Sequence, residues 1–324
     1  MTDYIIHSFR KRLMDYKTSG VDIIKGRSFV EYIKALAPNI GGFNGMMEIP
    51  SGYEKPVLVS GADGVGTKIN ICRIAFDYTT IGQDLVAMCV NDVICSGAKP
   101  LYFLDYISTK SLDPNVTDIV NGIATGCAMA GMELLGGETA EHFRQTDYDL
   151  AGFCTGIVEK NDIVDGTNIR PGDVVIGIES SGLHSNGYTI VNDMLWRNYI
   201  YYKEMPELLV PTTIYARLIQ HLLGKVPISG MAHITGGGLP ENLPRCLPKH
   251  LTVDVDWSAW ERPELFNKIQ EAGEIAEEEM RNVFNCGIGF CIVVSPDAVE
   301  LVQNLIADTP FGMRSWVIGT VKNK

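Results

Sequence analysis

The chain has 324 residues, 46% of them hydrophobic, which is enough for one large domain or two ordinary domains with real cores. Its formal net charge of −12 argues against nonspecific binding to nucleic acid or to an anionic membrane, because both require a basic surface. No apolar run reaches the roughly 18 residues of a membrane span, and the N-terminus lacks the apolar core of a signal peptide. We therefore expect a cytosolic protein.

In the first half, residues 56–63 (PVLVSGAD) have the pattern of a buried strand that runs into a glycine loop. Residues 81–96 carry apolar side chains at helical spacing and end before Gly97, a typical C-terminal cap. The same reasoning predicts strands at 101–107 and 151–158 and a helix at 114–130.

A polar, turn-rich stretch at 160–172 separates the two halves, and we place a domain boundary there, giving domains 1–168 and 169–324. The second half is expected to contain strands at 174–180, 251–255, 287–294 and 314–321 and helices at 187–198, 212–223 and 263–272. This alternation of strands and helices predicts an α/β or α+β fold. Eight cysteines without a CxxC pair or zinc spacing indicate buried free thiols.

Three acidic residues of the first half, Asp63, Asp92 and Glu138, lie in glycine-rich or apolar runs. A carboxylate in such a place loses several kcal/mol of hydration unless a cation or hydrogen-bond donors replace the water. Oxygen ligands beside flexible glycine loops suit Mg²⁺, which is usually held by a few carboxylates together with substrate phosphates. The pattern therefore predicts a magnesium–nucleotide site.

The segment GADGVGTK (61–68) has glycines at P-loop separation, but its Thr-Lys pair stands in reversed order, so it is not a Walker A loop. Gly64 and Gly66 would let backbone N–H groups approach an anion, with Lys68 as counter-charge and Asp63 as metal ligand. An ordinary Asp-Gly turn between strands is the alternative.

On the helix predicted at 81–96, Asp84 and Asn91 are seven residues apart, hence on one face and about 10 Å apart along the axis. They cannot easily ligate one ion, and Asp92 points about 80° away. The helix would line an extended polyphosphate cleft. The alternative for Asp84 is a solvated acid in the first turn, favoured by the helix dipole.

Two loops of the second half combine glycines with polar side chains: SSGLHSNGY (180–188) and HITGGGLPEN (233–242). The first is suited to anion binding at a helix N-terminus, with His184 as donor or proton carrier. In the second, exposed backbone amides beside His233 and Thr235 favour phosphate binding. A structural histidine and a tight turn remain the alternatives. HExxH, GxSxG, GxGxxG and HRD motifs are absent, so several common enzyme classes lose their usual support.

Taken together, these segments resemble the phosphoribosylformylglycinamidine cyclo-ligase (AIR synthetase) family of the AIR synthase-related ATP-binding superfamily. The resemblance runs in order from YKTSGVDI (16–23) and GGFNG (41–45) to FNCGIGF (284–290). DGVGTK and GGET occur across the superfamily, whereas VAMCVNDV, PLYFLDY and the pairing of HSNGY with TGGG are more particular to the cyclo-ligases.

The resemblance implies a two-domain α/β subunit whose N-terminal domains pair into a β-barrel homodimer, with ATP near the joint. It also implies an activity in purine biosynthesis: ATP-dependent ring closure of a phosphorylated ribonucleotide, formylglycinamidine ribonucleotide, through a phosphoryl imidate. Phosphoryl transfer of this kind needs mainly Mg²⁺, phosphate clamps and positioning.

The site residues carried over from the resemblance fall into three sets. The Mg–ATP site would comprise Asp63, Gly64, Gly66, Thr67, Lys68, Asp84, Asn91, Asp92 and Glu138, with Asp63, Asp84, Asp92 and Glu138 as metal ligands. The substrate would contact His184, Ser185, Asn186, Thr235, Gly236, Gly237 and Gly238. Catalytic roles are expected for His184, Lys68 and Asp92.

The chain departs from the family pattern in a shorter 141–150 loop, in Thr213 where a basic residue is common, and in a long N-terminus with Met14 as a second possible start. Thiamine-monophosphate kinase and a non-catalytic Mg-nucleotide scaffold remain alternatives. Selenophosphate synthetase is disfavoured, because no cysteine precedes Cys72.

Overall fold

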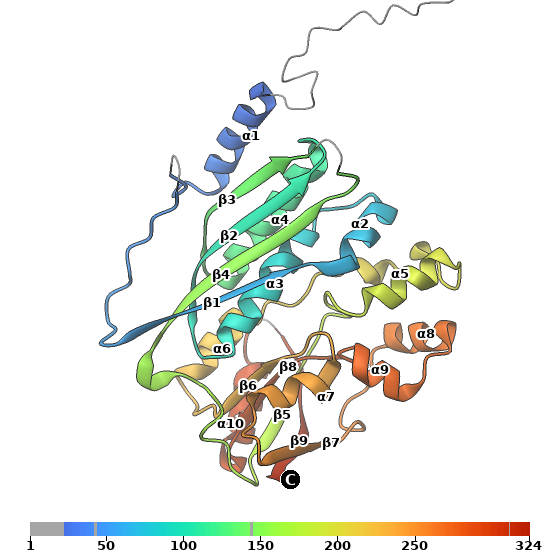
Figure 1. Ribbon diagram of the computed structural model, residues 1–324. Coiled ribbons are helices and arrows are strands. Elements are labelled where there is room, and N and C mark those ends of the chain that lie inside the picture. The colour runs from blue at the N-terminus through green and yellow to red at the C-terminus, as the bar shows by residue number, and fades with distance from the viewer. Residues whose placement is uncertain (1–22, 42–43, 143–144, 311) are drawn as a thin grey trace, which may run out of the picture.

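The computed structural model describes residues 23–41, 44–142, 145–310 and 312–324, which form two sheets with helices packed around them (Figure 1). Met14, most of the YKTSGVDI segment and part of GGFNG lie outside these described residues. Within the described ranges, none of the helices combines the length and the apolar character needed to cross a bilayer.

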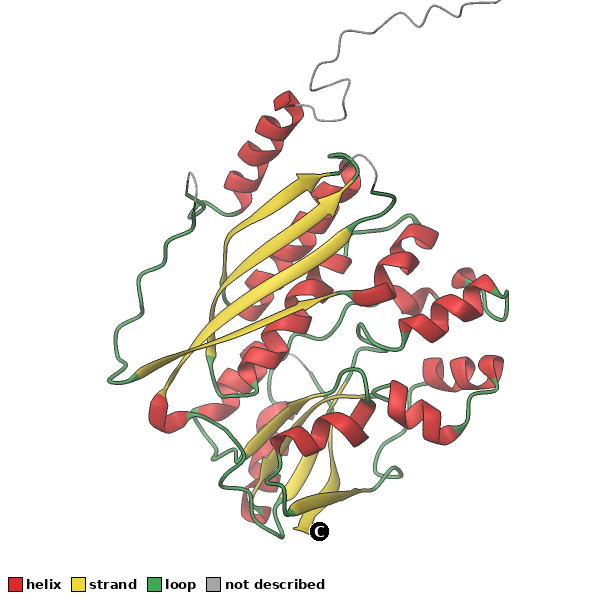
Figure 2. Ribbon diagram, viewed as in Figure 1, coloured by secondary structure: helices red, strands yellow, loops and turns green. Residues whose placement is uncertain are grey.

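The first sheet has the strand order β1-β4-β2-β3. Its strands are β1 (Pro56–Gly64), β2 (Lys99–Thr109), β3 (Glu133–Glu141) and β4 (Asp149–Glu159). Helices α3 (Ile81–Ile94) and α4 (Pro114–Ala130) cover one face of this sheet (Figure 2). They pack closely because Gly82 and Gly122 meet where they cross, and a side chain at Gly82 would collide with the α4 backbone.

Local signals explain the bounds of α4. The Asp113 side chain caps the N-terminus by accepting from the Val116 amide, and Pro114 follows at the first helical position. Gly131, with φ of 73°, ends the helix in the left-handed conformation that glycine adopts most easily.

The second sheet has the order β6-β8-β5-β9-β7, and its central strand pairs are antiparallel. Its strands are β5 (Val174–Glu179), β6 (Gly230–His233), β7 (Leu251–Val255), β8 (Ile288–Val294) and β9 (Ser315–Asn323). The remaining helices are α1 (Ile23–Leu36), α2 (Ile69–Ala75), α5 (Tyr188–Trp196), α6 (Ala216–Leu223), α7 (Gly238–Asn242), α8 (Glu264–Gly273), α9 (Glu277–Val283) and α10 (Val299–Ala307). The predicted mixed α/β class is confirmed.

The other face of the first sheet has no helix over it in Figure 2. Large apolar side chains lie exposed there: Leu58 of β1, Phe153 of β4 and Tyr106 of β2. Their neighbours Val57 and Val59 pack against the core, as the two-residue period of a strand requires.

Several elements differ from the sequence-based expectation. Helices α1, α2, α9 and α10 and strand β6 were not predicted, and two further differences lie in α6 and β3. The helix predicted at 212–223 begins only at Ala216, because the preceding residues are extended and bonded to α3. Strand β3 was not predicted, since the two glycines and the acids of ELLGGETAE are uncommon in strands. It pairs in parallel with β2.

Candidate active site

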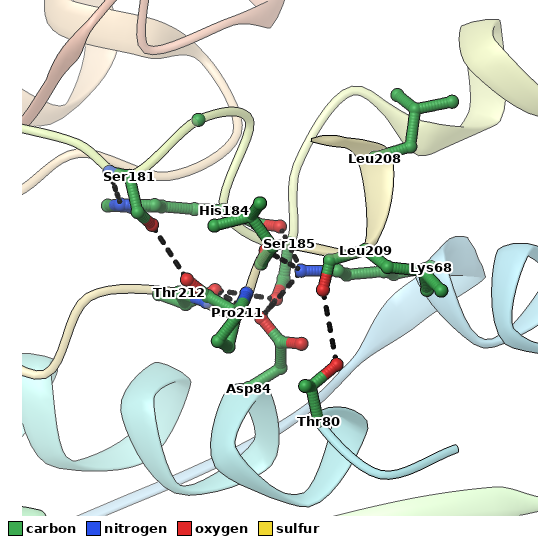
Figure 3. A network of polar contacts seen from close by, with 12 residues as sticks. Lys68, Thr80, Asp84, Ser181, His184, Ser185, Leu208, Leu209, Pro211 and Thr212 are labelled. Carbon is green, nitrogen blue, oxygen red and sulfur yellow. Dashed lines mark hydrogen bonds and ion pairs between the residues drawn. The ribbon is translucent and has the colours of Figure 1, made fainter. Parts of the chain in front are cut away.

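Lys68 and Asp84 form an ion pair in the interior between the two sheets (Figure 3). The Lys68 Nζ lies 2.8 Å from the Asp84 Oδ1, and both side chains have no exposed surface. Lys68 follows the glycine loop after β1, while Asp84 lies in the first turn of α3.

The remaining donors of Lys68 reach the second half of the chain. Nζ donates to the His184 carbonyl at 2.9 Å and to the Val210 carbonyl at 2.7 Å. All three ammonium donors are therefore used within the protein. The expectation that Lys68 is a free counter-charge for phosphate is wrong for this structure.

Asp84 accepts four bonds at one oxygen. Besides Lys68, its Oδ1 accepts from the Thr212 amide at 2.7 Å, the Thr212 hydroxyl at 2.6 Å and the Ser185 hydroxyl at 3.1 Å. Asp84 is thus not a solvated acid. These four donors satisfy Oδ1 alone, because Oδ2 is buried without a hydrogen-bond partner among the described residues. Ser185 is buried and directs its hydroxyl to Asp84.

Asn91 lies on the same face of α3 as Asp84, as the seven-residue spacing predicted. Its amide nitrogen donates to the Thr213 carbonyl at 2.8 Å, and its Oδ1 accepts from the Tyr215 amide at 3.0 Å. Asp84 and Asn91 together bind the extended segment before α6. Asn91 is fully buried, so its expected role in nucleotide binding is also wrong here.

His184 is a core residue. It has no exposed surface and adopts a φ of 62°, and its Nε2 accepts from the Ser181 amide at 3.2 Å. A side chain at Gly289 would collide with the His184 and Tyr215 rings. Burial holds the pKa of His184 well below 6.5, so the ring is neutral, and the expected role as proton carrier to a bound substrate is not supported.

Asp63 and Asp92 form an accessible acidic pair at the junction of the sheets. The Asp92 side chain is 49% exposed, and the His233 Nδ1 lies 2.8 Å from its Oδ1. Burial raises the pKa of Asp63, and the negative charge of Asp92 raises it further. The two carboxylates repel one another at a partly open position. A hard cation such as Mg²⁺ would relieve this repulsion, because it binds carboxylate oxygens.

A cavity of about 320 Å³ opens beside Asp92 and His233. It is also lined by Arg245 and Asn242, so it lies next to the 235–238 loop. The sequence singled out His233 only as a neighbour of that loop. Its contact with Asp92, 141 residues away, has no local signal in the sequence.

Glu138 is not brought to this pair. Asp63 lies on the edge strand β1, and Glu138 lies on the opposite edge strand, β3. A side chain at Gly137 would meet Asp105, so Glu138, one residue further, points to the other face of the sheet. No cluster of three acidic, His or Cys side chains suited to a metal occurs within the described ranges. The expectation of four carboxylates in one cleft is therefore wrong for a single chain.

The glycine loop at 235–238 is held by Asn242. Its amide nitrogen donates to the Gly236 carbonyl at 2.9 Å and to the Gly238 carbonyl at 2.8 Å, while Thr235 donates to its Oδ1. Gly237 has a φ of 92°, which glycine adopts at little cost. Asn186 lies beside Gly236, so two of the predicted substrate segments do meet.

Known protein families match both halves of the chain. Residues 45–158 match the N-terminal domain, and residues 170–324 the C-terminal domain, of AIR synthase related proteins. The phosphoribosylformylglycinamidine cyclo-ligase of Prochlorococcus marinus (strain MIT 9313) is 48% identical over 332 residues, covering 95% of this chain and 96% of the relative. That of Synechococcus sp. (strain CC9605) is 50% identical, covering 95% of each.

Solved structures share the fold at low identity. E. coli HypE, a hydrogenase maturation protein, superposes with a TM-score of 0.70 at 18% identity, covering 93% of this chain and 91% of HypE. Thiamine-monophosphate kinase from Stenotrophomonas maltophilia K279a gives 0.66 at 15% identity, with coverages of 92% and 94%. These likenesses establish the architecture alone.

Proposed function

Since the chain belongs to the AIR synthase related family, and within it to the phosphoribosylformylglycinamidine cyclo-ligases, we propose that it closes the imidazole ring of its substrate with ATP. The substrate is formylglycinamidine ribonucleotide and the product is 5-aminoimidazole ribonucleotide, in purine biosynthesis. The observation that carries this proposal is 48% identity to a named cyclo-ligase across 95% of the chain.

The chemistry balances with one ATP. The formyl oxygen attacks the γ-phosphorus and ADP leaves, which converts a poor leaving group into a phosphoryl imidate. A substrate nitrogen then attacks the formyl carbon and closes the ring. The C–O bond breaks, phosphate departs with the former formyl oxygen, and the nitrogen loses its proton. The protein contributes mainly position and charge to such a transfer.

Asp63 and Asp92 would hold Mg²⁺, and the raised pKa of Asp63 supports this choice of ligands. When bound, the ion would neutralise charge on the transferring phosphoryl group. The backbone amides of Gly64, Gly66 and Thr67 would bind the ATP phosphates. We call residues 64–68 the nucleotide loop.

The ribose phosphate of the substrate would lie at Gly236–Gly238, with Asn186 beside it. Asp92 remains the best candidate of the three expected catalytic residues, because Lys68 and His184 lie in the interior. In this proposal residues 1–168 bind Mg–ATP and residues 169–324 bind the substrate phosphate. The likeness of each half to its own family domain supports a boundary close to residue 168.

We also propose that two chains form a homodimer through the open face of the first sheet. Leu58 is 55% exposed and Phe153 is 46% exposed there, although both are large apolar side chains on adjacent strands. An exposed apolar face of this kind usually marks a surface that a partner chain covers. The enzyme would act in the cytoplasm.

Purified protein given ATP, Mg²⁺ and formylglycinamidine ribonucleotide should form 5-aminoimidazole ribonucleotide and ADP in equal amounts. ATP binding without this product would exclude the cyclo-ligase and leave the nucleotide-binding scaffold. Phosphorylation of thiamine monophosphate in a parallel assay would favour the kinase.

A further inference from the structure

The nucleotide loop is tied to a second loop by buried charge. Lys68 is the last residue of the nucleotide loop, and its ammonium crosses to the carbonyl of His184 in the segment 181–187. We call this segment the His184 loop. It carries Asn186, which lies beside the glycines proposed to bind the substrate phosphate.

The connection between the two loops is rigid because water is excluded from the Lys68–Asp84 pair. Neither Lys68 nor Asp84 has exposed surface, so water cannot replace a bond that is lost. Removing one partner of a buried, charge-assisted pair is strongly destabilising, because it leaves the other charge unpaired in the interior. A displacement of the nucleotide loop must therefore carry the His184 carbonyl with it or break these bonds.

Asp84 extends the connection to a third segment. The same Oδ1 that binds Lys68 also accepts from Ser185 and Thr212, and Val210 gives its carbonyl to Lys68 (Figure 3). The nucleotide loop, the His184 loop and the 210–212 segment thus share a single pair of charges.

The conformation of His184 depends on these bonds. A φ of 62° is unusual for a residue with a side chain and is a strained conformation that the surroundings must hold. Lys68 binds its carbonyl, and the Ser181 amide binds its ring. Releasing Lys68 would remove part of the support for the backbone that presents Asn186, two residues further along the chain.

We propose that Lys68 and Asp84 are positioning residues that couple the nucleotide loop to the His184 loop, so that a bound nucleotide orders the loop that faces the phosphorylated substrate. The identities of the two ligands rest on the proposed function. Coupling of this kind is reciprocal, so the substrate must raise the affinity for the nucleotide by the same factor.

The test uses the full chain and a double substitution, Lys68→Met with Asp84→Asn. This variant removes both charges together, and the asparagine keeps an oxygen that accepts from Thr212 and Ser185. It therefore cuts the link to the nucleotide loop without leaving an unpaired buried charge. The matched control is Thr80→Val, which loses a bond from α3 to the Leu209 carbonyl but touches neither loop.

Hydrogen–deuterium exchange is measured with and without a non-hydrolysable Mg–ATP analogue. We expect the analogue to slow exchange of residues 181–187 in the natural chain and in Thr80→Val, but not in the double variant. Equal protection in the double variant, or no protection in the natural chain, would overturn the coupling.

Kinetics give a second readout. The double variant should raise the substrate KM by about fivefold or more while kcat changes less, because coupling energies of this kind are usually worth about 5–150-fold in affinity. An unchanged KM would contradict the proposal. The two proposals can fail separately. If the proposed function is wrong, the natural chain shows no turnover. The exchange experiment does not require turnover, so it still decides whether the two loops are coupled.

Discussion

The imidazole of His233 and the carboxylate of Asp92 meet across the junction of the two sheets, with Nδ1 2.8 Å from Oδ1. The ring is almost fully buried, whereas the carboxylate is half exposed. An ionised carboxylate can only accept, so His233 donates and fixes the direction of Asp92.

His233→Ala should therefore weaken Mg²⁺-dependent activity without removing it. Loss of a group that orients a metal ligand typically costs about 10–100-fold in metal affinity or activity. The measurement is the Mg²⁺ concentration at half-maximal turnover. His221→Ala, which removes an exposed histidine on α6, serves as the control and should behave as the natural chain. Equal Mg²⁺ dependence in both variants would contradict this role.

Asp63→Asn and Asp92→Asn should each lower kcat by about a hundredfold or more, since a ligand to the catalytic cation is lost. Thermal unfolding should change little, because the removed charges repel each other. Asp165→Asn is the control. Asp165 lines the cavity beside Asp92 and His233, but its carboxylate only closes a turn with Thr167. Natural rates in Asp63→Asn and Asp92→Asn would exclude the metal assignment.

His184 should make stability depend on pH. Its pKa in the folded chain is well below 6.5, so below pH 6.5 the unfolded chain binds a proton that the folded chain does not. Stability is complete above that pH and falls by up to about 1.4 kcal/mol per unit as the pH drops. Urea unfolding of His184→Gln should show a smaller slope between pH 7 and 5. His221→Gln should keep the natural slope, and equal slopes in all three chains would refute the prediction.

Asp105 should make the stability of the fold depend on pH in the opposite sense to His184. Burial raises the pKa of this half-buried carboxyl to about 7 from an ordinary 3.8, so the folded chain binds the extra proton between these values. Its ionisation therefore costs stability as the pH rises through this window. Asp105→Asn should stabilise the protein by roughly 2 kcal/mol more at pH 8 than at pH 5. The exposed Asp149→Asn should show no such difference, and a pH-independent effect at Asp105 would sink the assignment.

Phe153→Asp should convert the proposed dimer to a monomer, because a charge would be placed in the middle of the covered face. Light scattering after size exclusion measures this directly. Trp196→Asp is the control, since Trp196 is 80% exposed on α5, away from the sheet. A dimer that survives Phe153→Asp would place the contact elsewhere.

The sequence allowed those parts of the fold to be predicted that local chemistry specifies. Strand β7 and helix α4 have the predicted bounds, since their periods and caps lie in the segments themselves. Strand β3 has no such signal, because its partner β2 and not its composition makes it a strand.

For the site, the sequence identified the right loops but misplaced several side chains. It located Asp63 and Asp92, whose apolar surroundings are visible in the chain. It misjudged Lys68, because two of its acceptors are backbone carbonyls more than 100 residues away and carbonyls have no sequence signature. It misjudged His184 for a different reason, since the polar composition of its loop does not reveal that the His184 side chain is buried.

Lys68 and Asp84 bind chemically different partners in the second half of the chain. This difference limits which relatives can supply the second half of a chimera. Lys68 binds main-chain carbonyls in the second half, which any sequence supplies if the backbone keeps its course. Asp84 requires the hydroxyls of Ser185 and Thr212. A chimera joined near residue 168 would therefore tolerate a foreign second half that keeps these two hydroxyls, and would fold poorly with one that lacks them.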